Sequence, residues 1–210
     1  MAEQFAIPRL WDGATAVVIA CGPSLDLAQV RTVARARASG AVRAIAVNDA
    51  VYPAWWADVL YACDAKWWRF NGGVPGFSGL KIGLEPVPEH PEVNCAAKSG
   101  DYGFDPDPRY LRTGSAGGHQ AVCAAVHLGA ARVVLLGFDC TGRPGRLHWH
   151  GDHPQPLRNP QPQTFEKWLR AYDALAPELG RRGIDVINAT PGSAIAAFRK
   201  LSLEEALACR

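Results

Sequence analysis

The densest group of reactive side chains in this sequence is the stretch LHWHGDH. It places His148, His150, Asp152 and His153 within six residues, so three of the six histidines of the chain lie there. An imidazole near its unperturbed pKa takes a proton from a hydroxyl group at neutral pH, which is the role of a general base. Two or three imidazoles and a carboxylate would also satisfy zinc. We favour the general base; a metal site and a solvated polar loop without chemistry remain alternatives.

A second group of polar residues follows predicted strands, at the points where the strands end. Its members, in chain order, are Gly22 and Ser24, Asn48 and Asp49, Asp64, Asp139, Asn188 and Thr190. In an open parallel sheet the carboxyl ends of the strands share one edge, and ligands bind in the crevice there. A turn alone explains any one of these residues, because turns begin where strands end. Five such strand ends together favour a nucleotide site.

Two glycine-rich turns lead into predicted helices. The first, Gly22-Pro23-Ser24, follows a buried apolar run, and we expect Ser24 to cap the helix after it. The second spans residues 113–118, before an alanine-rich helix. Free N–H groups at a helix N-terminus bind phosphate. Asn48 is an amide that donates and accepts hydrogen bonds toward a ribose or a base, where a dinucleotide enzyme would place a carboxylate.

These residues must be positioned by buried strands that alternate with helices. We predict strands over residues 16–20, 42–47, 59–63, 80–84, 93–97, 132–136 and 184–187, and helices that include residues 119–128 and 164–180. This alternation is typical of right-handed βαβ units, so the predicted fold class is α/β: a Rossmann-like, doubly wound, mostly parallel sheet with helices on both faces. We expect one nucleotide-binding domain over residues 1–210, with residues 140–162 forming a long histidine-containing lid loop.

The composition excludes several classes of protein. The chain has 210 residues, 48% of them hydrophobic, which is enough for a globular core. The net charge is +2 with dispersed basic residues, which gives no argument for nucleic acid as a partner. No apolar run is long enough to span a membrane, and the first residues lack the pattern of a signal peptide, so we expect a cytoplasmic protein. The six cysteines have no C-x-x-C spacing, and we expect them to be reduced.

Seven segments occur in an order that is familiar from a known family. They are VVIACGPSL, AIAVND, TGSAGG, VVLLGFD, the histidine loop, EKWLRAYDAL and NATPGSAIAAF. In this order they resemble the bacterial sialyltransferases of glycosyltransferase family 42 and related uncharacterised proteins, some of them phage-encoded. The G-P-S-L turn is also similar to that of 6-hydroxymethylpterin diphosphokinase-like proteins. The resemblance spans residues 17–198 and implies a Rossmann-like transferase that uses a CMP-sugar, with a lid histidine as base and no required metal or other cofactor.

The resemblance also implies roles for particular residues. By the resemblance, the nucleotide-binding residues are Gly22, Pro23, Ser24, Asn48, Asp64, Ser115 and Gly117, and the strand-end residue Asp139 completes the predicted set. The catalytic candidates are His153, His148 and His150, of which His148 or His153 would deprotonate the acceptor hydroxyl that attacks the anomeric carbon. The sialyltransferases stabilise the leaving phosphate with lid tyrosines, which residues 140–147 lack. Arg143 and Arg146 are the candidates for that role here, acting electrostatically.

Two other functions stay open from the sequence. A nucleotide-dependent phosphoryl or diphosphoryl transferase would use Asp64 and Asp139 to hold Mg²⁺ against the phosphates. A non-catalytic phage or bacterial module would keep the nucleotide crevice without the chemistry, as the missing lid tyrosines suggest. In each case the expected partner is a nucleotide or nucleotide sugar; the acceptor is unknown, and a homo-oligomer stays open.

Overall fold

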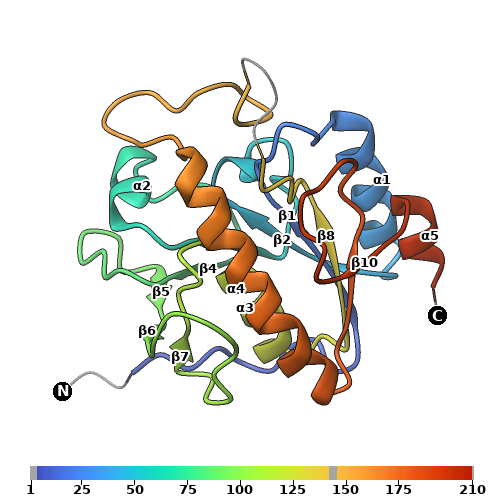
Figure 1. The fold of residues 1–210 in the computed structure, drawn as a ribbon. Coiled ribbons are helices and arrows are strands. Elements are labelled where there is room, and N and C mark those ends of the chain that lie inside the picture. Colours follow the sequence, from blue (N-terminus) through green and yellow to red (C-terminus); the bar gives the residue numbers. More distant parts are fainter. Residues whose placement is uncertain (1–3, 142–145, 210) are drawn as a thin grey trace.

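The computed structural model describes residues 4–141 and 146–209. Within them, eight parallel strands form one sheet in the order β10-β9-β8-β1-β2-β3-β4-β5 (Figure 1). These strands are β1 (Thr15–Ile19), β2 (Arg43–Val47), β3 (Val59–Ala62), β4 (Leu80–Gly83), β5 (Val93–Cys95), β8 (Arg132–Leu136), β9 (Asp185–Asn188) and β10 (Arg199–Lys200). Two further short strands, β6 (Ala97–Lys98) and β7 (Tyr110–Leu111), pair in parallel beside the main sheet.

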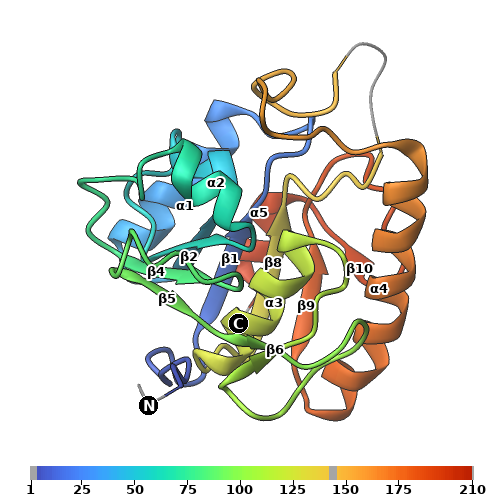
Figure 2. The same ribbon diagram turned by 90° about the vertical axis from the view of Figure 1, so that its left-hand side faces the viewer.

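Helices cover both faces of the sheet. They are α1 (Leu27–Ala38), α2 (Ala65–Phe70), α3 (Gly117–His127), α4 (Pro162–Arg181) and α5 (Leu203–Ala208), with a short 3₁₀ helix η1 (Asn48–Val51) after β2. Because successive strand residues face opposite ways, Ala16 and Val18 of β1 pack into one core, and Val17 and Ile19 pack into the other. Helices α3 and α4 close the first core, and α1, α2 and α5 close the second (Figures 1 and 2).

The strand order places a switch in direction beside β1. From β1 the chain moves outward through β2, β3, β4 and β5, and it then returns to pair β8 with the other edge of β1. In doubly wound folds, ligands bind at the carboxyl ends of the strands where the order switches. The turns after β1 and β8 therefore bound the expected crevice.

The predicted fold class is confirmed, and the buried strands lie within a few residues of their predicted positions. The start of α1 differs from the prediction. The helix begins at Leu27 with Asp26 as its N-cap, and Ser24 does not cap it because its side chain is bonded to Asp139. Among the described residues, no helix combines the length and the apolar character needed to cross a membrane.

Candidate functional site

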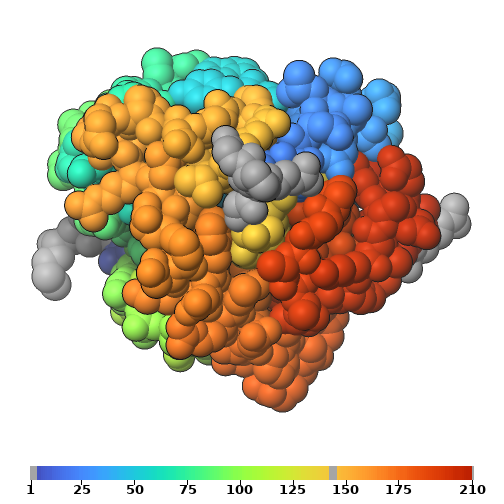
Figure 3. Space-filling model, turned by 45° about the horizontal axis from the view of Figure 1, so that its top comes forward, coloured from blue at the N-terminus to red at the C-terminus, as the bar shows by residue number. Residues whose placement is uncertain are grey.

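A cavity of about 490 Å³ opens at the switch point. Its wall includes the turns after β1 and β8, the residues at the ends of β2 and β3, the N-terminus of α3, the first turns of α4, and part of the segment 147–161 that precedes α4. Figure 3 shows part of this segment, in yellow to orange, on the surface at that end of the molecule. Nine predicted site residues line the cavity: Gly22, Pro23, Asn48, Asp64, Ser115, Gly117, Asp139, His148 and His153.

Four other predicted site residues are not placed in this wall. Ser24 and His150 lie outside it. Arg146 donates hydrogen bonds to the backbone carbonyls of His148 and Trp149, so it supports the histidine loop. Arg143 lies outside the residues that the structure describes.

The glycine turn after β1 has no free N–H group at its tip, because β8 packs closely against it. The N–H of Gly22 donates to the carbonyl of Gly137 at 2.9 Å, and the N–H of Leu25 donates to Gly22. The carboxylate of Asp139 accepts from the N–H of Ser24 at 3.1 Å and from its hydroxyl at 2.8 Å. A Cβ on Gly22 would lie 2.0 Å from that carboxylate. The hydrogen-bond donors of this turn are therefore already occupied by groups of the protein itself, among them the Asp139 carboxylate.

The N-terminus of α3 is a candidate anion site in the wall of the cavity. No side chain caps this helix, so its own structure does not satisfy the N–H groups of its first turn, which includes Gly117 and Gly118. Both glycines line the cavity. An uncapped helix N-terminus attracts negative charge through its free N–H groups and the helix dipole.

The backbone around the cavity is held in uncommon conformations. Among the described residues, four non-glycine residues have a positive φ, and three of them line the cavity: Asn48 (49°), Ser115 (54°) and Cys140 (50°). Such residues cost free energy and cluster at functional sites. Asn48 has a further sign of function, since its buried amide oxygen has no hydrogen-bond donor among the described residues. This oxygen is free to accept a hydrogen bond from a ligand.

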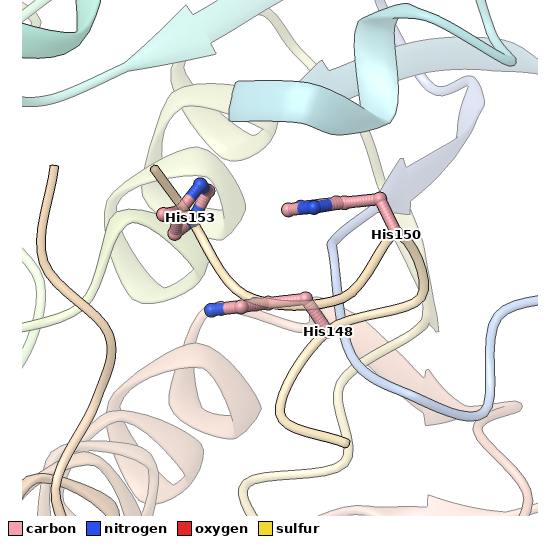
Figure 4. A group of neighbouring side chains, drawn as sticks. All are labelled: His148, His150 and His153. Carbon is pink, nitrogen blue, oxygen red and sulfur yellow. The ribbon is translucent and has the colours of Figure 1, made fainter. Parts of the chain in front are cut away.

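The three loop histidines lie close together (Figure 4), and two of them contact Asp49, which lies in η1. One carboxylate oxygen of Asp49 lies 3.0 Å from Nδ1 of His153 and 3.3 Å from Nε2 of His150. The other oxygen accepts the indole N–H of Trp67 at 3.0 Å. The rings of His148 and His150 are parallel, with centroids 5.2 Å apart. Asp49 therefore fixes the orientation of His153 and leaves Nε2 of that ring for other chemistry.

Burial sets the charge of this cluster. Burial, together with the neighbouring imidazoles, lowers the pKa of His148 to about 4. Burial also lowers the pKa of His150, although Asp49 opposes the shift. Burial alone would raise the pKa of Asp49, but hydrogen bonds from His153 and Trp67 outweigh burial and hold it below its ordinary value. At pH 7 the cluster thus combines neutral His148 and His150 with an ionised Asp49.

A second cavity, of about 430 Å³, adjoins the first. Four residues line both cavities: Asn48, Asp64, His153 and Arg158. The second cavity is otherwise lined by α2 and by charged side chains that include Lys66 and Glu85. His153 is thus one of the residues that the two adjacent cavities share.

Sequence reasoning missed two contributors to the site. Asp49 appeared there as one of several strand-end residues, and Arg158 as one of several dispersed basic residues. The structure brings Asp49 to the histidines and places Arg158 in the wall of both cavities. Four aromatic side chains also line the first cavity: Phe138, Phe165, Trp168 and Tyr172. The sequence shows that Phe165 and Trp168 lie on one face of the helix, but it does not show that this face lines the cavity.

The magnesium alternative depends on Asp64 and Asp139, and both line the first cavity. Asp139 is engaged by Ser24, and Asp64 accepts a weak contact from the thiol of Cys63 at 3.2 Å. Within residues 4–141 and 146–209, no group of three metal-capable side chains contains either aspartate. Mg²⁺ in proteins is usually bound by one or two carboxylates together with substrate phosphates, so the magnesium alternative stays a prediction.

Comparison with known proteins supports the fold. No protein-family model matches the chain, and no curated protein matches it. Among solved structures, the chain is similar to the MAf glycosyltransferase from Magnetospirillum magneticum AMB-1, with a TM-score of 0.64 and 18% sequence identity. The match covers 99% of this chain and 36% of that one, so this chain spans about a third of the length of the neighbour. At this identity the similarity shows a shared Rossmann-like α/β fold.

Proposed function

We propose that the protein is a nucleotide-sugar glycosyltransferase of the CMP-sugar type, which works without a metal ion and uses His153 as its general base. The observation that carries the proposal is the position of His153, whose Nδ1 faces Asp49 in the wall between the two cavities. The similarity of the fold to a glycosyltransferase and the resemblance of the motifs to CMP-sugar-dependent enzymes support the same class. The first cavity would take the donor, and the second would take the acceptor.

In this mechanism Nε2 of His153 takes the proton of the acceptor hydroxyl, because Nδ1 is held by Asp49. The acceptor oxygen then forms a bond to the anomeric carbon of the sugar, and the bond from that carbon to the phosphate oxygen breaks. The Asp49 carboxylate stabilises the imidazolium that forms, as a carboxylate does for the histidine of a catalytic triad. The nucleotide leaves with the electron pair.

The leaving phosphate gains negative charge, and two features of the first cavity would stabilise that charge. The N-terminus of α3 offers N–H groups at Gly117 and Gly118, and Arg158 offers a guanidinium group from the opposite loop. This replaces the predicted use of Arg146, which is engaged with the backbone of its own loop. Asn48 would orient the donor through its unpaired amide oxygen.

The test is release of CMP from CMP-sialic acid, with water as the acceptor. His153→Ala should lower the rate at least about 100-fold, since general-base catalysis contributes 10²–10⁴-fold. Asp49→Asn should lower the rate by a similar factor and leave the affinity for CMP within about threefold. His90→Ala is the matched control, because His90 lies away from the cavity and contacts Glu92.

Equal rates for His153→Ala and the wild type would contradict the assignment of the base. Absence of both CMP release and CMP binding in the wild type would contradict the donor class. Loss of CMP binding together with loss of turnover in His153→Ala would assign His153 to binding rather than to proton transfer.

A further inference from the structure

The histidine loop brings three imidazoles together far more closely than one base requires. The ring centroids lie 5.2 Å apart for His148 and His150, 4.5 Å apart for His148 and His153, and 4.9 Å apart for His150 and His153. One nitrogen from each ring lies within 4.8 Å of one nitrogen from each of the others. Among the described residues, no other group of three metal-capable side chains converges in this way. In Figure 4 the rings of His148 and His150 lie one above the other, and His153 stands beside them.

These separations are close to those of a metal-bound trio of histidines. Zinc binds imidazole nitrogens at about 2.0–2.1 Å in a tetrahedron, which sets the ligating nitrogens about 3.4 Å apart. The three rings therefore need to approach one another by at most about 1.5 Å. All three project from one short segment, residues 148–153, which lies outside the helices and strands. Rotation of the side chains can supply this approach without moving the sheet or its helices.

The surroundings of the trio also resemble those of a metal site. A histidine that binds a metal through one ring nitrogen normally donates its other N–H to a carboxylate or a carbonyl. The Asp49 carboxylate lies 3.3 Å from Nε2 of His150 and 3.0 Å from Nδ1 of His153, so a carboxylate that can orient metal-binding imidazoles contacts two of the three rings. The Nε2 atom of His148 is buried and has no hydrogen-bond partner among the described residues. A metal ion would satisfy this buried nitrogen.

We propose that His148, His150 and His153 form a binding site for a divalent transition-metal ion of the zinc class, with Asp49 as the carboxylate that orients two of the ligands. Three nitrogen ligands favour Zn²⁺, Co²⁺, Ni²⁺ or Cu²⁺ and disfavour Mg²⁺ and Ca²⁺, which take oxygen ligands. The fourth position is open to water or to a ligand in the adjoining cavity.

The experiment titrates the metal-free protein, prepared with a chelator, with Co²⁺ and with Zn²⁺. We expect one equivalent of Co²⁺ to give the visible absorption of a tetrahedral nitrogen site, and Zn²⁺ to displace it. His150→Ala and His148→Ala should each weaken binding at least about tenfold, and Asp49→Asn should weaken it about 10–100-fold. His90→Ala is the control for a histidine elsewhere on the chain. Circular dichroism verifies that each variant is folded.

The proposal fails if wild-type protein gives no Co²⁺ absorption at millimolar metal. It also fails if folded His148→Ala and His150→Ala bind Zn²⁺ as tightly as the wild type, because the metal would then bind elsewhere. These readouts involve no nucleotide and no turnover, so they test the metal site independently of the enzyme activity.

One consequence rests on the proposed function. His153 cannot hold a metal ion and accept the proton of the acceptor through the same nitrogen, so zinc at this site should suppress CMP release, and a chelator should restore it. A protein that binds zinc but releases CMP equally well with it would keep the metal site and remove His153 as the base. Turnover that requires zinc would likewise keep the metal site and remove His153 as the base. A protein that binds zinc and releases no CMP in either state would keep the site and overturn the proposed function.

Discussion

At the scale of single residues, two aspartates that follow parallel strands have opposite uses because their neighbours differ. Asp139 follows β8 and accepts two hydrogen bonds from Ser24, so it fastens the end of β8 to the end of β1. Asp49 follows β2 and faces the imidazoles of His150 and His153, and within the described part of the chain its other side-chain partner is the indole of Trp67. The first carboxylate joins two crossovers of the fold, and the second is available for chemistry.

A buried histidine in α3 makes a prediction about stability. His119 is fully buried, and burial lowers its pKa to about 4. In the unfolded chain its pKa is the ordinary value of about 6.5, so below that pH the unfolded state binds more protons and folding stability falls as the pH falls. Between pH 7 and pH 5 this one group should cost about 2 kcal/mol of unfolding free energy.

The measurement is urea unfolding of the wild type and of His119→Leu at pH 7 and pH 5. The variant lacks the titrating group, so its loss of stability between the two pH values should be smaller by about 2 kcal/mol. Other histidines titrate in both proteins and cancel in the comparison. An equal loss in both would mean that His119 is solvated or protonated in the folded state.

Residue identities were easier to predict than residue partners. Seven of the nine predicted residues that line the cavity were found because strand ends and glycine turns are local patterns, and the other two, His148 and His153, because the histidine-rich loop is one. The hydrogen bond between Ser24 and Asp139 joins positions 115 residues apart, and no local sequence pattern predicts it. The same holds for Asp49, whose importance depends on histidines about 100 residues later in the chain.

At the scale of elements, the turn after β1 is shaped by packing. Gly22→Ala would place a Cβ 2.5 Å from the carbonyl oxygen of Gly137 and 2.0 Å from the Asp139 carboxylate. Because the first of these neighbours is backbone, relief requires β1 and β8 to separate at their ends. We expect Gly22→Ala to lower the free energy of unfolding by about 3 kcal/mol or more.

Gly180→Ala is the matched control, because a Cβ there meets nothing within 4 Å and the residue lies in α4. Alanine has the higher helix propensity, so this change should raise the free energy of unfolding by up to about 1 kcal/mol. Chemical denaturation of both variants measures the two effects. Comparable stabilities for the two variants would show that the ends of β1 and β8 can separate at little cost.

The N-terminus of α3 can be tested by removing one N–H group. Gly117 is the first residue of the helix, where proline is tolerated, and the residue before it is extended (φ −142°, ψ 124°), as a residue before proline must be. Gly117→Pro should therefore keep the helix and remove one donor. Loss of a hydrogen bond to a charged phosphate should weaken nucleotide binding about 10–100-fold.

Gly117→Ala is the control, because it keeps the N–H group and its Cβ would lie an ordinary 3.6 Å from Val47. Its affinity for the nucleotide should stay within about threefold of the wild type. Calorimetric titration with CMP measures both variants. Equal affinity for the proline and alanine variants would place the phosphate elsewhere in the cavity.

Local sequence patterns predicted the elements well where burial is continuous. The apolar runs of β1 and β8 are buried on both faces, so each run predicts its strand by composition alone. The predicted strand over 93–97 divides instead into β5 and β6, which belong to different sheets. That division depends on the pairing of β6 with β7, which lies in a glycine- and proline-rich part of the sequence without a clear period.

At the scale of the whole molecule, the first cavity joins both halves of the doubly wound sheet. Its wall includes the turn after β1, the turn after β8, and the N-terminal parts of α3 and α4. These elements unfold with the sheet, so a ligand that bridges them stabilises the folded chain as a unit. A ligand at 100 times its dissociation constant adds about 2.7 kcal/mol, which should raise the unfolding midpoint by roughly 5–10 °C in a chain of this size.

We therefore expect CMP and CDP to raise the midpoint of thermal unfolding with or without Mg²⁺, and UDP, GDP, ADP and ATP to raise it less. The absence of a magnesium requirement follows from the commitment of Asp139 to Ser24, which leaves the phosphates to the N-terminus of α3 and to Arg158. A shift that needs Mg²⁺ and an adenine nucleotide would instead favour phosphoryl transfer and would require Asp139 to leave the turn. No shift with any of the six would mean that the cavity at the switch point binds something other than a nucleotide, because a phosphate held across both halves of the sheet cannot leave the stability of the sheet unchanged.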